Sequence, residues 1–395
     1  MGSNLQQRAA AALEKSKTFI EELTVRSAVN RPAAVVTGSN RFFSWDNEHR
    51  SRENGAPYLY SWSYYNGVIF EGLQYIYEKT GDPAYPPYIR EFLDAMITDG
   101  ALNEHAGYVP YHGLDCYKTA SLLMDYAEFG TGGAPKESPY CRVVSQLYHD
   151  LTQVNACHAE EKLGGNYWHC WREGKPPLYK VWLDGIYMAQ PFLVKYAAKA
   201  RDTAQLEAVY QRFRWVAQEM ADQKTGLYYH AANSREDYCP FFWLRAIGWY
   251  AMAQVNVMEY LPEKYLPEMK QDLKRFIDAM LKYQDASGMW RNLVDRPLSE
   301  TNRTETSGTA MIIYCILKAV RMGWLQDEDG AYRFAAQKAF CDMAEEKLQE
   351  RALKDIYLMA EATGLNNYEK ADWYKVDEGK GVGPYIMAYS EMIKI

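Results

Sequence analysis

Residues 184–200, DGIYMAQPFLVKYAAKA, have helical spacing and are apolar on nearly every side. A helix of this kind is buried all round, whereas a surface helix keeps one charged face. Five further stretches open with small or polar residues and continue in the same way, and they begin at Asn66, Asp115, Arg245, Thr306 and Val382. The intervals between them are uneven, so the chain predicts a loose repeat of buried helices.

A second set of stretches alternates with the first and keeps its charges on one face, as helices with one side in water do. These stretches are residues 5–23, 84–97, 141–154, 204–220, 266–283 and 331–348. Six buried and six half-exposed helices in alternation predict an all-α fold. We expect an (α/α)6 barrel, a closed ring of helical hairpins, in which residues 1–395 form one catalytic domain. An open helical solenoid is the alternative, but six repeats is the number at which such a ring can close.

Four connections into the predicted inner helices resemble one another. Each begins with Gly and soon has an aromatic residue, and they start at Gly107, Gly165, Gly226 and Gly288. The pattern predicts short, hairpin-like strands that loop into the next inner helix. All inner helices run the same way in a ring of hairpins, so these loops and the helix N-termini meet at one end. That end is the predicted functional site.

Composition limits the classes of partner and the location. A net charge of −7 over 395 residues disfavours nucleic acid and anionic membranes, because both require a cationic face. No apolar run reaches 18 residues and the N-terminus reads as an amphipathic helix, so we expect a cytoplasmic protein. Seven scattered cysteines without CxxC spacing predict neither a disulfide framework nor a structural zinc site. The 33 Tyr and 11 Trp fit a ligand cleft or a large core.

Charged residues occur at the predicted rim. Asp184 lies in the first turn of its helix, where an Asp is either an N-cap or a functional acid, and the same two alternatives hold for Asp115. Arg245 is more informative, because a cation at a helix start opposes the helix dipole and so predicts an anionic ligand. The alternative is a buried pair with Glu305 or an Asp. Other side chains expected at this rim are His230, Trp243 and Trp249.

At these residues the sequence resembles a known enzyme family. The stretches WLDGIYMA, YYHA, FWLRAIGW, GMW followed by ETSGTAM, and GVGPYIMAYSEM are similar to those of the unsaturated rhamnogalacturonyl hydrolases. These form glycoside hydrolase family 105, related to the unsaturated glucuronyl hydrolases of family 88. The matches run in family order from WSYYNGV, near residue 62, to the C-terminus. The resemblance implies an (α/α)6 barrel that removes a 4,5-unsaturated uronic acid from the non-reducing end of oligosaccharides left by a polysaccharide lyase.

The resemblance also implies a mechanism, in which the enzyme hydrates the C4=C5 enol ether. A general acid protonates C4, water adds at C5, and the resulting hemiketal opens and expels the glycoside. By resemblance Asp184 is the acid/base and Asp115 holds the ring hydroxyls or the water, and such catalysis contributes about 10² to 10⁴ in rate. The general acid must carry a proton when the substrate binds, but a helix N-terminus lowers the pKa of an Asp. Burial beside Trp182 and the charge of Asp115 are expected to raise the pKa of Asp184 again. The reaction requires no metal and no organic cofactor.

The remaining family positions are expected to bind the small oligosaccharide substrate. They are Tyr64, His169, Trp182, His230, Trp243, Arg245, Trp249 and Trp290. Two positions depart from the family pattern: Cys170 stands where Lys is expected after Trp-His, with Lys175 or Lys180 as possible substitutes, and Leu244 replaces a common Gly. Both departures affect which sugar can stand next to the unsaturated residue, and they do not affect the hydration step.

Other functions fit the same predicted scaffold. A sugar epimerase is expected to place several histidines at the rim, where only His169 and His230 are candidates. An inverting glycosidase requires two carboxylates about 6.5 to 9.5 Å apart, and Asp115 with Asp184 can supply them in principle. A lyase is a further sister enzyme. A non-catalytic helical-repeat binding protein would spread its aromatic residues over an open concave face, and the similar loops gathered at one end count against it.

Overall fold

The computed structural model describes residues 2–23, 62–103, 106, 108, 113–155, 158–170, 177–349, 352–356, 365, 368 and 374–395. Lys175 and most of the loop from Gly107 lie outside the described residues. Among the helices within these ranges, none is both long and apolar enough to cross a membrane.

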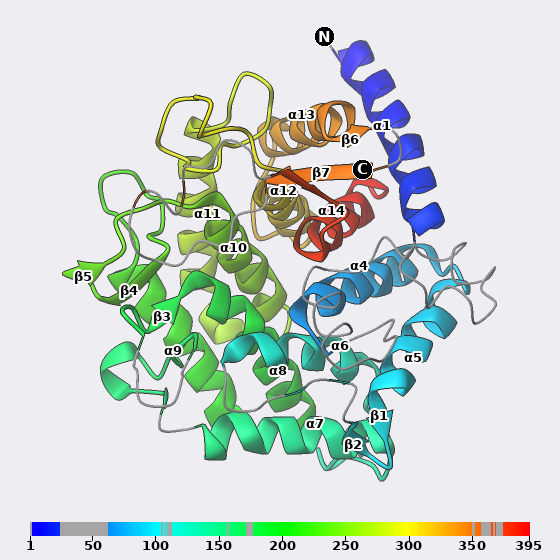
Figure 1. The fold of residues 1–395 in the computed structure, drawn as a ribbon. Helices are drawn as coiled ribbons and strands as arrows, with labels where there is room; N and C mark the ends of the chain where they lie inside the picture. Colours follow the sequence, from blue (N-terminus) through cyan, green and yellow to red (C-terminus); the bar gives the residue numbers. More distant parts are fainter. Residues whose placement is uncertain are drawn as a thin grey trace.

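Six helices in the described part of the chain form a closed inner ring (Figure 1). They are α4 (Tyr64–Thr80), α6 (Lys118–Tyr126), α8 (Leu183–Ala200), α10 (Leu244–Met258), α12 (Thr306–Arg321) and α14 (Gly379–Met392). Each packs on the next, and α14 packs on α4, which closes the ring. The predicted (α/α)6 barrel is confirmed, and the open solenoid is excluded.

The outer layer holds six helices in the described ranges, at the positions predicted for half-exposed helices. They are α1 (Gly2–Leu23), α5 (Tyr85–Met96), α7 (Pro139–His149), α9 (Thr203–Glu219), α11 (Leu266–Lys282) and α13 (Ala331–Glu346). Each helix from α5 to α13 packs on the inner helix that precedes it, and α1 packs on α13 and α14. The N-terminal helix thus completes the outer layer beside α14 (Figure 1).

Capping side chains begin two of the outer helices, whereas α5, α11 and α13 lack one, as the inner helices do. Ser138 and Asp202 cap the outer helices α7 and α9 by accepting a backbone N–H at 3.1 and 3.0 Å. The inner helices α4, α8, α10, α12 and α14 receive no such bond from their own N-cap side chains. At α12 the carboxylate of Asp355, in a distant strand, accepts from the backbone N–H groups of Thr306 and Ser307. The N-cap side chains of the inner ring are therefore available for other contacts.

Short antiparallel strands occupy the connections from outer to inner helices. They are β1 (Ile97–Thr98), β2 (Ala101–Leu102), β3 (Val181–Trp182), β4 (Ala231–Ser234), β5 (Asp237–Tyr238), β6 (Leu348–Gln349), β7 (Ala352–Ile356) and β8 (Tyr374–Val376). Short helical turns are η3 (Leu114–Tyr117), η4 (Asp150–Val154), η6 (Glu161–Leu163) and η7 (Glu263–Tyr265). The strand β3 pairs with β4 of the following connection, which joins two predicted loops in one sheet. The loop from Gly288 forms isolated bridges instead of a strand.

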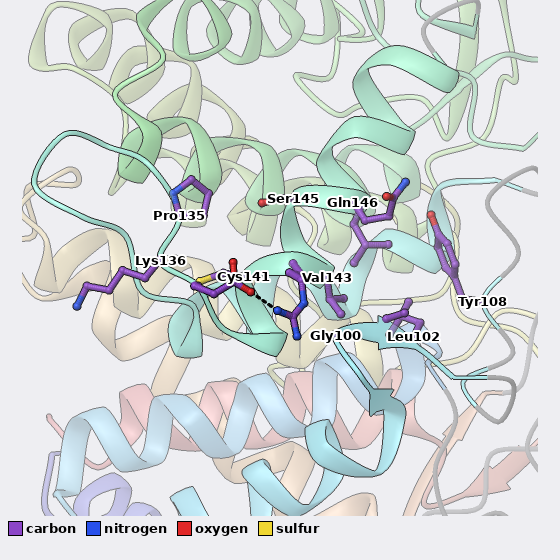
Figure 2. Close-up of a pocket in the computed structure, with 13 residues that line it drawn as sticks. Gly100, Leu102, Tyr108, Pro135, Lys136, Cys141, Val143, Ser145 and Gln146 are labelled. Carbon is purple, nitrogen blue, oxygen red and sulfur yellow. Dashed lines mark hydrogen bonds and ion pairs between the residues drawn. The ribbon is translucent and has the colours of Figure 1, made fainter.

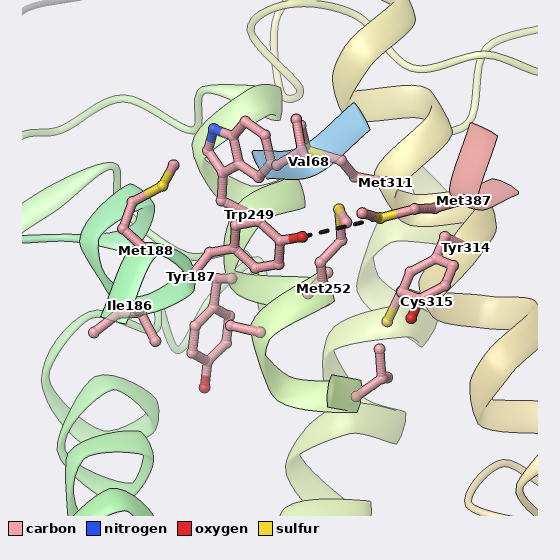
Figure 3. Packing of buried hydrophobic residues seen from close by; sticks show 14 of the residues in the cluster. Val68, Ile186, Tyr187, Met188, Trp249, Met252, Met311, Tyr314, Cys315 and Met387 are labelled. Carbon is pink, nitrogen blue, oxygen red and sulfur yellow. Dashed lines mark hydrogen bonds between the residues drawn. The ribbon is translucent and has the colours of Figure 1, made fainter. Parts of the chain in front are cut away.

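The core fills the ring and closes it below the site. Figure 3 shows side chains from several inner helices meeting there. Trp249 stacks on Tyr187 with 4.9 Å between ring centroids, and the Tyr187 hydroxyl donates to Glu71 at 3.0 Å. Glu71 pairs with Lys118 at 2.6 Å, and both side chains are fully buried. The charges of Glu71 and Lys118 thus neutralise each other, as charges buried away from water require.

Candidate active site

Asp184 and His230 face each other at the start of α8. Asp184 is the second residue of that helix, and His230 directly precedes β4, which pairs with β3 through Trp182 and Ala231. Asp184 Oδ2 lies 3.3 Å from His230 Nε2. His230 is fully buried, whereas the Asp184 side chain is 13% exposed, so the acid is the member of the pair that a ligand reaches. The N-cap position belongs to Trp182, so the N-cap alternative for Asp184 is wrong.

A buried tyrosine fixes the other side of His230. Tyr368 Oη lies 2.7 Å from His230 Nδ1, and it also contacts Cys239 Sγ at 3.2 Å. Burial holds the pKa of Tyr368 far above its usual range, so the phenol keeps its proton. When Tyr368 donates to Nδ1, the proton of neutral His230 lies on Nε2, which faces Asp184. Sequence reasoning missed Tyr368, which stands alone in a polar stretch with no repeat to mark it.

His169 lies between Asp115 and the first turn of α8. Its ring stacks on Trp182 at 4.7 Å, and its Nε2 lies 4.0 Å from Asp115 Oδ1. Gly185 permits this approach, because a Cβ at that position would lie 3.1 Å from His169 Nδ1. The Asp115 side chain is 51% exposed on η3, so it faces solvent at the rim. The structure thereby brings both predicted carboxylates to one histidine.

Aromatic rings border these polar groups. Tyr64 meets Trp249 edge to face at 6.2 Å, and Trp249 rests on Tyr187 (Figure 3). The Trp243 ring lies 4.8 Å from the ring of His230, and Trp182 lies 4.9 Å from the same ring. Trp182 and Trp243 therefore border His230, and Tyr64 and Trp249 form a second aromatic contact between α4 and α10.

Trp290 does not belong to this group. It is fully buried, and its indole N–H donates to the carbonyl of Met280 in α11 at 2.8 Å. Its backbone N–H donates to Thr309 Oγ1 at 3.1 Å. The side chain packs toward the outer layer, and its role in binding the sugar stays a prediction. A tryptophan in a Gly-Met-Trp stretch looks the same in the sequence whether it lines a cleft or fills a core.

Arg245 is buried in the first turn of α10 and pairs with a carboxylate. Its Nη1 donates to Glu305 Oε1 at 3.1 Å, and its guanidinium lies 4.5 Å above the Trp243 ring. Burial lowers the pKa of Arg245, but the charges of Glu305 and Asp355 outweigh burial and raise the pKa. Burial also raises the pKa of Glu305 to about 7 despite Arg245, and it lowers the pKa of Lys380 to about 7. The structural pairing expected as the alternative for Arg245 is thus present.

The pKa of Asp184 is shifted in the direction opposite to the predicted one. Burial raises the pKa, as expected, but the contact with His230 and the charge of His169 outweigh it. The net pKa of Asp184 is therefore below its usual value in the substrate-free protein. The sequence could not reveal this, because it depends on His230 Nε2 pointing at the carboxylate from another connection.

The histidines and cysteines of the rim form no metal-binding group. In the described ranges, no three His, Cys, Asp or Glu side chains gather as they would around a metal ion. His169 is engaged by Trp182 and Asp115, and the backbone of Cys170 bridges to Gly113. The six cysteines within the described residues are free thiols.

A separate pocket of about 700 Å³ lies outside the ring, between the β1–β2 hairpin and α7 (Figure 2). Its acid, Glu137, pairs with Arg142 and faces no histidine within the described lining. The pocket also contacts Tyr108, which donates to Asp150 at 3.1 Å. Its size alone does not make it the active site, because the facing acid and histidine lie at the helix N-termini instead.

Comparison with known proteins identifies the family. The model of glycosyl hydrolase family 88 matches residues 39–395. The chain belongs to that family. Protein Atu3128 of Agrobacterium fabrum is 28% identical over 230 residues, which cover 52% of this chain and 98% of that protein. Unsaturated rhamnogalacturonyl hydrolase YesR of Bacillus subtilis is 21% identical over 64% of this chain and 70% of its own.

A solved structure supports the same assignment. A family 105 glycoside hydrolase of C. acetobutylicum ATCC 824 is 26% identical, covers 85% of this chain and 94% of its own, and superposes with a TM-score of 0.70. The predicted relationship to families 105 and 88 is confirmed, and this family 88 member is a glycoside hydrolase.

The two departures from the expected family pattern have distinct surroundings. Leu244 is fully buried and packs against Gly308 of α12. Lys180 lies over the ring of Trp168 at 4.5 Å and pairs with Glu160. Trp168 donates to the same carboxylate at 2.7 Å. Lys180 is therefore next to the Trp-His pair, whereas Lys175 lies outside the described residues.

Proposed function

We propose that this family 88 hydrolase removes a 4,5-unsaturated uronic acid from the non-reducing end of lyase-generated oligosaccharides of the rhamnogalacturonan type. The observation that carries the proposal is the partly exposed Asp184 carboxylate facing the buried His230 at 3.3 Å, inside an aromatic rim. The Bacillus subtilis relative is an unsaturated rhamnogalacturonyl hydrolase by name, which supports this substrate class. The proposed reaction is hydration of the C4=C5 double bond.

In the proposed reaction Asp184 donates its proton to C4. The π electrons of C4=C5 form the new C–H bond, and the ring oxygen stabilises the positive charge left at C5. Water then adds to C5 and gives a proton to the Asp184 carboxylate, while Asp115 holds the water or the ring hydroxyls. The C5 hemiketal opens to a ketone, and the hemiacetal left at C1 releases the remaining oligosaccharide as an alcohol.

Arg245 is the proposed partner of the substrate carboxylate on C5. Its cation is buried at the start of α10, next to the Trp243 ring that borders His230. A carboxylate held near Asp184 also changes the acid itself, because a like charge raises the pKa of a neighbouring Asp. The lowered pKa of Asp184 in the empty site therefore rises when the anionic substrate arrives, and protonation follows binding.

The proposal is tested with the chromophore of the substrate. Unsaturated oligosaccharides from rhamnogalacturonan, from glucuronans and from glycosaminoglycans are mixed separately with the protein, and the ultraviolet absorbance of the conjugated double bond is followed. Selective loss with the rhamnogalacturonan products, with a product heavier by one water, is the expected result. Loss with another class would correct the substrate and keep the chemistry.

An inverting glycosidase is the second candidate function, favoured by one observation. Asp115 and Asp184 are both linked to His169, so two carboxylates share one rim. Persistent absorbance together with cleavage of a saturated oligosaccharide would establish this function and overturn the proposed hydration. An isomerised saturated sugar would indicate an epimerase instead.

A further inference from the structure

Glu305 occupies an N-cap position without capping its helix. It directly precedes α12 and has extended backbone angles, yet its side chain makes no cap hydrogen bond. Asp355 from β7 takes that role, because its Oδ1 accepts from the backbone N–H groups of Thr306 and Ser307 at 3.0 and 3.3 Å. An acid in this position usually bonds to its own helix. The Glu305 carboxylate is thereby directed elsewhere.

The carboxylate of Glu305 is directed at Arg245. Its Oε1 accepts from Arg245 Nη1 at 3.1 Å and from the Ser307 hydroxyl at 2.6 Å. Gly308 provides the space, because a Cβ there would lie 2.9 Å from Glu305 Oε2. Both members of the pair are buried, so the guanidinium is held by a charge-assisted hydrogen bond that is shielded from water.

A second contact fixes the plane of the guanidinium. The Arg245 group lies 4.5 Å above the Trp243 ring, and that ring lies 4.8 Å from His230. Among the described residues, the Glu305 carboxylate, the Ser307 hydroxyl at 3.5 Å and the Trp243 face thus hold the cation relative to the acid and histidine. Pre-organisation of this kind contributes to recognition, because the cost of ordering is met before the ligand binds.

We propose that Glu305 is a positioning residue that orients Arg245 for the carboxylate of the unsaturated uronic acid. This inference rests on the proposed function. Glu305 does not touch the sugar, and its effect passes through the direction in which Arg245 presents its N–H groups. Loss of the Glu305 charge therefore weakens recognition of an acidic sugar and leaves a sugar without that charge nearly unaffected.

Binding of two matched sugars tests the proposal without turnover. The background is Asp184→Asn, which removes the proposed acid. The two ligands are an unsaturated disaccharide and its uronate methyl ester, and tryptophan fluorescence reports the Kd of each. Asp184→Asn is expected to prefer the acid over the ester by about tenfold or more, as for a hydrogen bond to a charged group. Adding Glu305→Gln is expected to remove most of that preference.

Two further variants separate positioning from general damage. Arg245→Gln is expected to remove the preference alone, and Glu305→Gln added to it is expected to change nothing more, since both residues act through one interaction. Glu391→Gln is the matched control: Glu391 is another buried acid, which pairs with Arg321 at 2.8 Å near the far end of α14. It is expected to keep the full preference in the same background.

The outcomes are distinguishable. An unchanged acid preference after Glu305→Gln would overturn the positioning role and leave the proposed function intact. Equal weakening of acid and ester would assign Glu305 to stability alone and also overturn the proposal. Failure of both sugars to bind Asp184→Asn, when the folded protein melts normally, would overturn the proposed function and this inference together.

Discussion

Asp184 Oδ2 and His230 Nε2 lie 3.3 Å apart, and among the described residues neither atom has another hydrogen-bond partner. Two buried polar atoms are costly to leave unsatisfied. The two atoms are therefore poised to share a proton or to bond to a ligand, and this pair is the basis of the first predictions.

Asp184→Asn is expected to lower kcat by at least about 10² while the fold is retained, because the amide cannot donate a proton to carbon. Loss of ultraviolet absorbance from the unsaturated substrate measures kcat. Asp202→Asn is the matched control, since Asn also caps α9 and the site lies elsewhere. Near-normal turnover by Asp184→Asn would remove this residue from the mechanism.

His230→Gln is expected to extend activity to higher pH while lowering its maximum. Burial raises and His230 lowers the pKa of Asp184, so removal of the histidine leaves the effect of burial and raises that pKa. The protonated acid then persists to higher pH. The alkaline limb of kcat/KM against pH measures the shift. The exposed His149 supplies the control variant His149→Gln, and an alkaline limb unmoved by His230→Gln would contradict the proton-sharing pair.

Tyr368→Phe is expected to lower kcat by about tenfold, as for the loss of one hydrogen bond to a functional group. The phenyl ring keeps its packing against Phe241 at 4.7 Å, but His230 Nδ1 loses its partner, so the free energy of unfolding is expected to fall by about 1 to 3 kcal/mol. Nitrogen NMR of His230 is expected to show a changed tautomer balance. Tyr385→Phe removes a comparable buried hydroxyl, bonded to Ser16 at 2.6 Å, and tests whether any such loss slows the enzyme.

Gly185→Ala is expected to lower kcat/KM by about tenfold to a hundredfold, because small displacements at an active site have effects of this size. The new Cβ would lie 2.9 Å from Leu114 Cδ1 and 3.1 Å from His169 Nδ1, so the imidazole must move. Gly72→Ala crowds Ile386 at 2.9 Å in the core and serves as the control. Thermal melts should show similar losses of stability for both, with reduced activity specific to Gly185→Ala.

The two buried groups Glu305 and Lys380 are together expected to make a contribution to stability that is smallest near pH 7. The pKa of Glu305 is raised to about 7 by burial, so its contribution is complete at low pH and is lost as pH rises toward 7. The pKa of Lys380 is lowered to about 7 by burial, so its contribution is complete at high pH and is lost as pH falls toward 7.

Unfolding of the wild type and of Glu305→Gln across pH 4 to 10 checks this expectation. In Glu305→Gln the free energy of unfolding should no longer fall as pH rises toward 7. The rise of this free energy above pH 7, which comes from Lys380, should remain. Curves of the same shape for the two proteins would show that the pKa of Glu305 is the same in the folded and the unfolded chain.

Helix positions and the closed ring were predictable from periodicity. An all-round apolar pattern such as that of α8 and a one-sided pattern such as that of α9 have different physical causes, namely full and partial burial. The candidate acid was predictable because the family pattern surrounds Asp184 with a recognisable sequence. The sequence left two interpretations of Arg245, an anionic ligand or a buried ion pair. The structure shows that its buried partner is Glu305.

Contacts between distant segments were not predictable. A two-residue strand such as β3 has no periodicity, so its pairing with β4 leaves no local trace. The same holds for Asp355, which caps α12 from another connection, and for Tyr368, which reaches His230 across the site. The lowered pKa of Asp184 follows from one such contact, which explains why its direction was predicted wrongly.

The buried floor of the ring has a consequence for how the enzyme meets a polymer. Trp249, Tyr187 and the Glu71–Lys118 pair fill the space inside the ring below the first turn of α8, so the ring has no open channel there. A polysaccharide cannot thread through it, and only a chain terminus enters. Release of the unsaturated residue leaves a saturated end, so in the proposed reaction each oligosaccharide is cut once and the rate follows the concentration of unsaturated ends.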